Sequence, residues 1–285
     1  MNDLVIHQSS ADIIDSFIKQ PSHALLIVGP SGIGKQSLAD SIAEAVLAIT
    51  PATIDSYAYV KKIRPTEKNT ISIDEIRQLE RFLSLRVPLK KDFNRAVIIQ
   101  DAHALSLEAQ NALLKMLEEP PSGTIIILTT KHSQALLPTI RSRVQSINLT
   151  RPNKKQINSF FEGKDYSRDS IDRTYAVSGG LPGLMSSMLS DTDHPLTSAT
   201  SYARELLGST IYERLLKVDE LTKQRQLALD TTSILQQMSH ISLQTASGSR
   251  ALKWQSILKA SYGAHEGLSN NGNSKLILTK LMLSL

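Results

Sequence analysis

Short apolar runs alternate with amphipathic segments over the first 150 residues of the chain. The apolar runs are rich in aliphatic and β-branched residues and cover 24–28, 96–99, 124–128 and, more weakly, 144–149. Runs of this kind are typical of parallel strands that are buried on both faces. Apolar side chains recur at helical spacing in 35–49, 73–85 and 107–117. Strands that alternate with helices predict an α/β domain with a parallel sheet.

Helix signals are local in the first half and dominate the second half. Ser72 with Glu75 forms a capping-box pattern before residues 73–85, and Ser106 is a candidate N-cap for residues 107–117. From residue 151 onward the strand pattern disappears. Helical patterns then cover 154–161, 168–177 and 182–189, and longer ones follow with breaks near 208–209, 222–223, 247–249 and 270–272. The second half is therefore predicted to be all-helical.

Composition narrows the class of protein without naming a chemistry. The 285 residues are 41% hydrophobic and 21% charged, which excludes intrinsic disorder and suggests about two domains. Cysteine is absent, so disulfides, thiolate zinc sites and iron–sulfur clusters are excluded. The N-terminal residues lack the layout of a signal peptide, and no apolar run is long enough to span a bilayer. We expect a cytoplasmic protein, and the net charge of +5 does not by itself argue for nucleic-acid binding.

The first chemical motif follows the apolar run at 24–28 and precedes a helix. It consists of Gly29, Pro30, Ser31, Gly32, Ile33, Gly34 and Lys35, with Gln36 and Ser37 next. Glycines let backbone N–H groups turn towards phosphate oxygens, and the lysine adds a full positive charge. This context predicts a P-loop that binds nucleotide phosphates, and a chance glycine-rich turn is the alternative.

The groups that would hold a metal ion for hydrolysis are altered. Gln36 stands where a working P-loop has a Ser or Thr hydroxyl on Mg²⁺, and Ser37 is turned about 100° away along the helix. Gln100 and Asp101 end the run at 96–99, where hydrolysing relatives carry Asp and then Glu. Gln100 and Asp101 predict a degenerate Walker B motif, and both departures together predict no metal site and little hydrolysis. Asp101 and His103 could instead only solvate the end of a strand, and for His103 this is the interpretation we favour.

Several segments resemble one protein family. Residues 106–121 are similar to the helix after the Walker B strand in bacterial clamp loaders, and 136–143 resemble the motif that carries their arginine finger. Residues 70–77 resemble the segment between their Walker motifs, 178–183 match their lid signature in spacing, and 271–285 resemble their last collar helix. The chain thus resembles the delta-prime branch of the bacterial DNA polymerase III clamp loaders, which are AAA+ proteins.

The resemblance implies three domains and a set of partners. These domains are an AAA+ P-loop domain at 1–150, a helical lid at 151–190 and a helical collar for oligomerisation at 191–285. The implied partners are other clamp-loader subunits in a hetero-pentamer, the sliding clamp and primer–template DNA, with no membrane. Delta-prime members often have degenerate Walker motifs, so we expect no ATPase activity of its own and, at most, ATP or ADP bound without turnover. Residues 50–70 hold no cysteine, so the zinc module of many relatives is not expected.

The resemblance also assigns residue roles and leaves alternatives open. Arg143 is the expected arginine finger, acting in trans on a neighbouring subunit's ATP, while Arg141 is a candidate for structural pairing. Gly183 stands where ATP-sensing relatives have arginine. The sensor-one region falls at 129–131, without indicating which side chain faces the site. An active gamma- or tau-like ATPase and a nucleotide-sensing scaffold remain the alternative functions.

Two further features have a functional and an ordinary interpretation. Basic side chains that could contact DNA phosphates, or form a solvated face, are Lys61, Lys62, Arg64, Lys90, Lys91 and Arg95. Trp254 lies in an amphipathic pattern, which favours helix packing over a base-stacking role.

Overall fold

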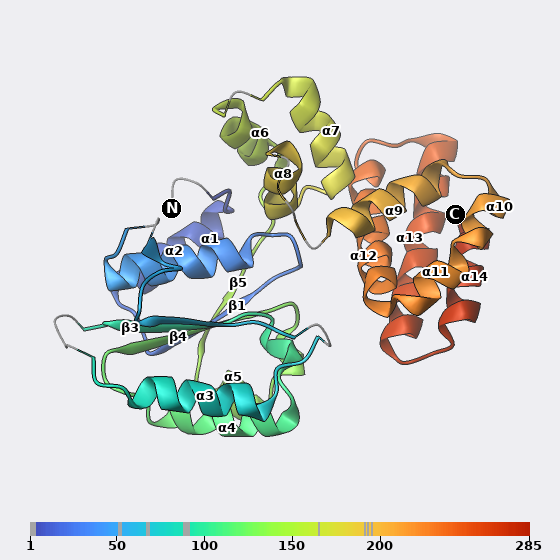
Figure 1. The fold of residues 1–285 in the computed structure, drawn as a ribbon. Coiled ribbons are helices and arrows are strands. Elements are labelled where there is room, and N and C mark those ends of the chain that lie inside the picture. The colour runs from blue at the N-terminus through green and yellow to red at the C-terminus, as the bar shows by residue number, and fades with distance from the viewer. Residues whose placement is uncertain are drawn as a thin grey trace. The chain divides into compact units, whose positions relative to one another are not determined.

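The computed structural model describes residues 4–50, 53–66, 69–87, 92–164, 166–190, 192, 194 and 196–285. The chain divides into two compact units, the first ending at Pro152 and the second beginning at Asn153. This boundary lies two residues beyond the predicted end of the α/β domain. Figure 1 shows the elements of each unit with their labels.

Unit 1 is built on a parallel sheet whose described strands number five. The strands are β1 (Ala24–Val28), β2 (Val60–Ile63), β3 (Arg95–Ile99), β4 (Thr124–Thr130) and β5 (Gln145–Asn148). Their order in the sheet is β2-β3-β4-β1-β5, and each described pair is parallel. The predicted α/β class with a parallel sheet is confirmed.

Helices cover both faces of this sheet (Figure 1). They are α1 (Gln8–Lys19), α2 (Lys35–Leu47), α3 (Ile73–Ser84), α4 (Leu107–Glu118) and α5 (Pro138–Arg141), with short 3₁₀ turns η2 (Ala102–Ala104) and η3 (Ser133–Ala135). Apolar residues of α1 and α2 pack with one set of strand residues, which includes Leu25, Ile98 and Ile127. Residues of α3, α4 and α5 pack with the alternate set, which includes Leu26, Ile99 and Leu128. The period of two along each strand therefore feeds two separate cores.

Burial separates the strands that the apolar pattern predicts from the one it misses. All residues of β3 and β4 are buried, in keeping with their continuous apolar runs. Strand β2 has the sequence VKKI, and its burial alternates because it lies at the edge of the sheet. Its two charged residues hide the alternation that would indicate a strand, so the apolar pattern misses β2. Helix α1 was not predicted either.

The predicted helix starts in unit 1 are confirmed. Ser72 and Glu75 form a reciprocal capping box at the start of α3. The Ser106 hydroxyl accepts a hydrogen bond from the Ala109 N–H at the start of α4 (3.2 Å). Each bond satisfies an amide that the first helical turn leaves without a partner, so these boundaries follow from local chemistry.

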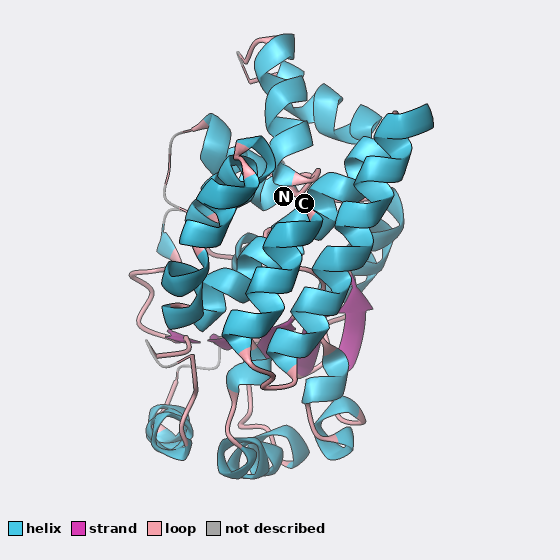
Figure 2. Ribbon diagram, turned by 90° about the vertical axis from the view of Figure 1, so that its right-hand side faces the viewer, coloured by secondary structure: helices cyan, strands magenta, loops and turns pink. Residues whose placement is uncertain are grey.

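Every described element of unit 2 is a helix, and helices make up most of the described chain (Figure 2). They are α6 (Lys154–Glu162), α7 (Arg168–Ser178), α8 (Pro182–Leu189), α9 (Thr197–Gly208), α10 (Ile211–Leu216), α11 (Val218–Lys223), α12 (Arg225–Leu243), α13 (Gly248–Ser269) and α14 (Ser274–Ser284). A helix end lies at or next to each predicted break, since α9 ends at Gly208, α11 ends at Lys223, and α13 begins at Gly248 and ends at Ser269. Among the described residues, no helix combines the length and apolar character needed to span a membrane. The division into a lid at 151–190 and a collar at 191–285 stays a prediction.

The end of α7 approaches the backbone of α12 closely. Gly179 caps α7 with a positive φ of 65°. A Cβ at this position would lie 2.3 Å from the Cβ of Gln237, closer than real Cβ contacts come. Glycine is required here by both the left-handed conformation and the lack of space. The first glycine of the Ser178-Gly179-Gly180 stretch therefore lets α7 pack on α12.

We expect Gly179→Ala to lower the free energy of unfolding of unit 2 by more than about 1 kcal/mol, because it adds strain at positive φ and a clash with Gln237. Gly263→Ala is the matched control, since Gly263 lies inside α13 with open space around its Cα. That control should be stabilising by roughly 0.5–1 kcal/mol. Urea unfolding of both variants measures the difference, and equal effects would contradict the close approach.

Candidate nucleotide site and arginine motif

The P-loop segment connects β1 to α2 and is tied to the neighbouring strand. The Gly29 N–H donates to the carbonyl oxygen of Thr130, at the end of β4 (3.1 Å). Gly32 and Gly34 have φ values of 79° and 98°, which side chains other than glycine rarely adopt. Gly34 is the N-cap of α2, so the loop leads directly into the positive end of a helix. This is the backbone geometry of a phosphate-binding loop.

Lys35 is buried at the start of α2 and faces back onto the loop. Its Nζ donates to the carbonyl oxygens of Gly29 (2.8 Å) and Pro30 (3.0 Å). Burial lowers the pKa of Lys35 to about 8, although the carboxylate of Asp101 acts in the opposite direction. The positive charge of Lys131 lowers the pKa further. The ammonium group thus stands at the P-loop next to the end of β3, where an anionic ligand would restore its charge.

The residues expected at the metal position do not form a metal site. Gln36 and Ser37 are exposed on the first turn of α2, and Gln100 is buried after β3. Gln36 and Gln100 offer amides where Mg²⁺ would take a hydroxyl and a carboxylate. In the described part of the chain, no cluster of three or more His, Cys, Asp or Glu side chains is placed to hold a metal ion. The donor set therefore fits a phosphate but does not fit Mg²⁺.

Hydrogen bonds at the end of β4 show how Thr129 and Thr130 are oriented. Asp101 has a left-handed backbone (φ 48°), and its N–H donates to the Thr129 hydroxyl (3.0 Å). The Thr130 hydroxyl donates to the carbonyl oxygen of His132 in the following turn (3.1 Å). Thr129 therefore faces the Walker B position, whereas Thr130 holds the chain that leaves β4.

His103 belongs to this cluster, and the expectation that it merely solvates a strand end is wrong. Its side chain is 19% exposed, with Nδ1 3.9 Å from Asp101 Oδ1 and 3.5 Å from the Thr130 hydroxyl. Burial lowers the pKa of His103 to about 4, although the Asp101 carboxylate acts in the opposite direction. His103 is thus neutral at pH 7. The sequence indicates that His103 follows the strand. It does not indicate that the side chain is buried, because burial depends on contacts with residues distant in sequence, such as Thr130.

We expect the wild-type protein to gain stability relative to Lys35→Met as the pH rises from 8 to 10.5. In this interval folded Lys35 has lost its proton, whereas the unfolded lysine, with its ordinary pKa of 10.5, still binds one. Unfolding then takes up a proton and becomes less favourable with rising pH, by up to about 1.4 kcal/mol per pH unit. Urea unfolding of both proteins at pH 7.5 and pH 10 measures this difference. A difference that is constant with pH would contradict the lowered pKa of Lys35.

Arg143 follows α5 and is 36% exposed. Its Nη2 lies 2.8 Å from Glu118 Oε1 at the end of α4. Its Nη1 donates to the carbonyl oxygen of Thr139 (3.0 Å) and to the Ser142 hydroxyl (3.3 Å). These partners lie on α4, on α5 and in the turn after α5, so the structure does not bring Arg143 to the P-loop of its own chain. Arg141 is exposed.

Gln110, which the sequence reasoning did not single out, holds the segment before α5. Its side chain is buried in α4, and its Oε1 accepts a hydrogen bond from the Leu137 N–H (2.8 Å). Its Nε2 donates to the carbonyl oxygens of Leu105 (3.3 Å) and Ala135 (3.4 Å). A buried amide with all these bonds made fixes α5 relative to α4. A glutamine in an amphipathic helix gives no sequence signal of this role.

The predicted basic surface is wrong for two of its members. Arg95 is buried, and its guanidinium donates to the carbonyl oxygens of Phe82 and Leu85 and to the Thr124 hydroxyl. Lys62 forms ion pairs with Asp40 (2.9 Å) and Asp55 (2.6 Å). Lys61 and Arg64 are exposed, whereas Lys90 and Lys91 lie outside the described residues.

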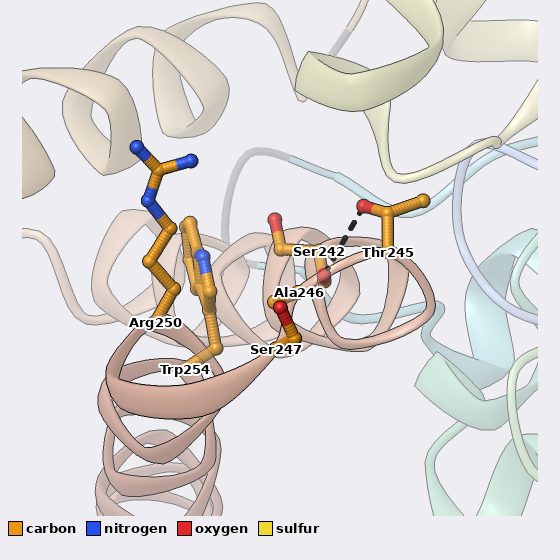
Figure 3. A pocket seen from close by; sticks show the side chains of 6 residues that line it. All are labelled: Ser242, Thr245, Ala246, Ser247, Arg250 and Trp254. Atoms are coloured by element: carbon orange, nitrogen blue, oxygen red, sulfur yellow. Dashed lines mark hydrogen bonds between the residues drawn. The ribbon is translucent and has the colours of Figure 1, made fainter.

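Trp254 lies in unit 2, where it lines a pocket between the end of α12 and the start of α13 (Figure 3). The other lining residues are Ser242, Thr245, Ala246, Ser247 and Arg250. Trp254 is half-buried, and its ring lies beside the Arg250 side chain in Figure 3. The helix-packing interpretation therefore holds for only part of the ring.

Residues 15–153 match the family model described as DNA polymerase III, delta subunit. The unit 1 sequence is similar to curated delta-prime subunits. DNA polymerase III subunit delta' of Pseudomonas aeruginosa is 30% identical over 180 residues, which are 57% of this chain and 54% of that protein. The Escherichia coli subunit delta' is 29% identical over 177 residues, 56% of this chain and 52% of that protein. The chain spans about half the length of these curated relatives.

Similarity extends to a second class of subunit and to solved structures. Subunit tau of Bacillus subtilis is 35% identical over 156 residues, 49% of this chain and 26% of that protein. A DNA polymerase III gamma subunit-related protein of Thermotoga maritima superposes with a TM-score of 0.50 at 20% identity, covering 96% of this chain and 97% of that one. A RuvB mutant from the same organism gives a TM-score of 0.51 at 14% identity, covering 98% and 86%. The chain therefore has the predicted fold, an α/β domain on a parallel sheet followed by helices.

Proposed function

We propose that this chain is a largely non-hydrolysing, delta-prime-like subunit of a replicative clamp loader. In this role it helps load the sliding clamp on primer–template DNA and supplies Arg143 to the ATP site of a neighbouring subunit. The observation that carries the proposal is a P-loop backbone that retains its lysine while Gln36 and Gln100 replace both metal-binding groups. A site of this kind supports phosphate binding without hydrolysis.

The electrostatics of the site support little or no hydrolysis. The transferred phosphoryl group carries charge that hydrolysing P-loop proteins stabilise with Mg²⁺. Here the buried residue after β3 is Gln100, which carries no charge to hold a hydrated metal ion. Asp101 is the nearest carboxylate along the chain, but its backbone is held by Thr129 and its side chain stands beside His103. The site thus lacks a carboxylate pair in which one group holds metal and the other orients water.

Nucleotide binding without turnover is compatible with the position of Lys35. A bound ATP or ADP would offer phosphate oxygens in place of the carbonyl oxygens that now accept from its Nζ. This exchange replaces two neutral acceptors by a charged one, which favours the protonated lysine. We propose no zinc and no metal ion for this subunit.

The proposed partners are the other subunits of a hetero-pentamer, the sliding clamp and DNA, with the cytoplasm as the site of action. DNA contact is assigned mainly to the assembly, because Arg95 and Lys62 are engaged by hydrogen bonds and ion pairs within the chain. The chain's own contribution to DNA is limited to exposed cations such as Lys61 and Arg64. Residues 191–285, whose described elements are all helices, are proposed as the collar that joins the ring.

We expect the purified protein to hydrolyse Mg²⁺-ATP no faster than its Lys35→Ala variant, because the metal-binding groups are absent. A steady-state assay of phosphate release measures this, and the control is an ATP-hydrolysing clamp-loader subunit assayed in parallel. ATP turnover that is lost in the Lys35→Ala variant would support the alternative of an active gamma- or tau-like ATPase. The similarity to subunit tau is the observation that favours this alternative. Failure to associate with any clamp-loader subunit would instead support a nucleotide-sensing scaffold.

We expect Arg143→Ala to lower ATP turnover at the neighbouring site of a reconstituted ring by roughly 10³–10⁵-fold, the usual worth of an arginine finger. The variant should fold and assemble, because the Arg143 side chain is partly exposed. Arg141→Ala is the matched control, since this exposed arginine lies two residues away, and it should leave turnover unchanged. Equal turnover with both variants would remove Arg143 from the proposed mechanism.

A further inference from the structure

Among the residues that the structure describes, Glu118 is the acidic side chain that pairs with the Arg143 guanidinium. The Glu118 carboxylate lies 2.8 Å from Nη2, while Nη1 is bonded to the Thr139 carbonyl and the Ser142 hydroxyl. The two nitrogens are thus engaged by different kinds of group. Nη1 is held by neutral acceptors within four residues of Arg143. Nη2 faces the negative charge of Glu118. A nucleotide phosphate could form the same charge-assisted hydrogen bond in its place.

Glu118 stands where a carboxylate is unfavourable unless a cation accompanies it. It is the last residue of α4, and Glu119 follows as the C-cap. The negative end of a helix dipole disfavours acidic side chains in the last turn. The ion pair with Arg143 offsets this cost for Glu118. No ion pair between Glu119 and Arg143 is seen in the described structure, so the two glutamates differ in this one contact.

The pair is formed between elements that are fixed to each other. Gln110, two turns before Glu118 on α4, binds the N–H of Leu137 at the start of α5. Leu137 and Ile140 pack in the same core cluster as Leu113 and Leu117 of α4. The Cα positions of Glu118 and Arg143 are therefore set by a packed core, and only their side chains have to move to separate.

The pair is weak enough to be broken by a better anion. The side chains are 49% and 36% exposed, and ion pairs of this exposure contribute little because water screens them. A nucleotide phosphate group carries more negative charge than one carboxylate and accepts the same charge-assisted hydrogen bond, so it can replace Glu118 at Nη2. Exchange of Glu118 for a phosphate thus requires no unfolding and no backbone rearrangement.

We propose that Glu118 acts as a clasp that competes with the neighbouring subunit's nucleotide for Arg143. The proposal rests on the proposed role of Arg143 as an arginine finger and adds a regulatory element to it. While the clasp is closed, Nη2 is withheld from the nucleotide. When it opens, Nη1 keeps its bonds to Thr139 and Ser142 and Nη2 is free to reach the phosphate. Glu118 is a positioning residue, because it acts on the reaction through Arg143.

The test uses a ring reconstituted with the ATP-hydrolysing subunits of the same organism, with ATP turnover as the measurement. Glu118→Gln should raise kcat by about two- to five-fold, which corresponds to about 0.4–1 kcal/mol. KM for ATP should change by less than about two-fold, because an arginine finger acts on the transition state. Glu119→Gln is the matched control: it removes the same charge from the same helix end and should leave kcat unchanged.

A double variant separates the clasp from the finger. Glu118→Gln should have no effect on kcat in the Arg143→Ala background, because the competed group is then absent. The proposal is overturned if Glu118→Gln leaves kcat unchanged or lowers it while Arg143→Ala still impairs turnover. It is also overturned if the rise persists without Arg143 or appears equally with Glu119→Gln. If Arg143→Ala itself has no effect, the finger assignment fails instead.

A conservative variant covers the case in which Glu118→Gln assembles poorly. Glu118→Asp keeps the charge but is one methylene shorter, so its bond to Nη2 is weaker and kcat should lie between wild type and Glu118→Gln. Thermal unfolding of each variant should stay close to wild type, since the pair is largely exposed. An aspartate variant with kcat above that of the glutamine variant would contradict the clasp.

Discussion

The parallel pairing of β4 with β1 and β3 is the constraint on which the candidate site depends. It brings the carboxyl ends of three strands, separated by up to about a hundred residues in sequence, to one edge of the sheet. Two hydrogen bonds at the end of β4 hold the P-loop and the segment after β3 in place. The Thr130 carbonyl accepts from Gly29 in the P-loop, and the Thr129 hydroxyl accepts from the Asp101 N–H after β3. The phosphate loop and the Walker B position are thus held by adjacent residues of one buried strand.

Within this framework the loop has the backbone geometry and the lysine of a phosphate-binding loop, whereas Gln36 and Gln100 carry amides where Mg²⁺ would take a hydroxyl and a carboxylate. The positive-φ glycines, the start of α2 and Lys35 depend on backbone geometry and on one side chain, and all are present. The metal position depends on side-chain oxygens, and amides replace them at Gln36 and Gln100. Burial then dominates the local electrostatics, because it lowers the pKa values of both Lys35 and His103 while Asp101 offers only partial compensation.

Helix α4 links this edge of the sheet to the arginine motif. Its N-terminal half follows η2 and carries Gln110, which bonds to Leu105 on one side and to Leu137 at the start of α5 on the other. Its last residue, Glu118, holds the guanidinium of Arg143. One rigid element thus contacts both the chain that leaves the Walker B strand and the group proposed to serve a neighbouring subunit. The physical difference between its two contacts is burial, because the Gln110 side chain is buried whereas the Glu118–Arg143 pair is partly exposed to solvent.

The amino-acid sequence by itself determined those features whose signals are local. Apolar runs predicted four of the five described strands, Ser72 and Ser106 predicted two helix starts, and the spacing from Gly29 to Lys35 predicted the P-loop between β1 and α2. The glutamines at 36 and 100 predicted a degenerate metal position for the same reason. The tertiary structure alone decided which side chains meet across the fold. It showed Arg95 buried against Phe82 and Leu85, Lys62 paired with acidic residues, His103 enclosed beside Thr130, and Arg143 held by Glu118. From sequence alone, a charged residue is predicted to be solvated, because ion pairs and burial depend on distances in space that no local pattern of residues contains.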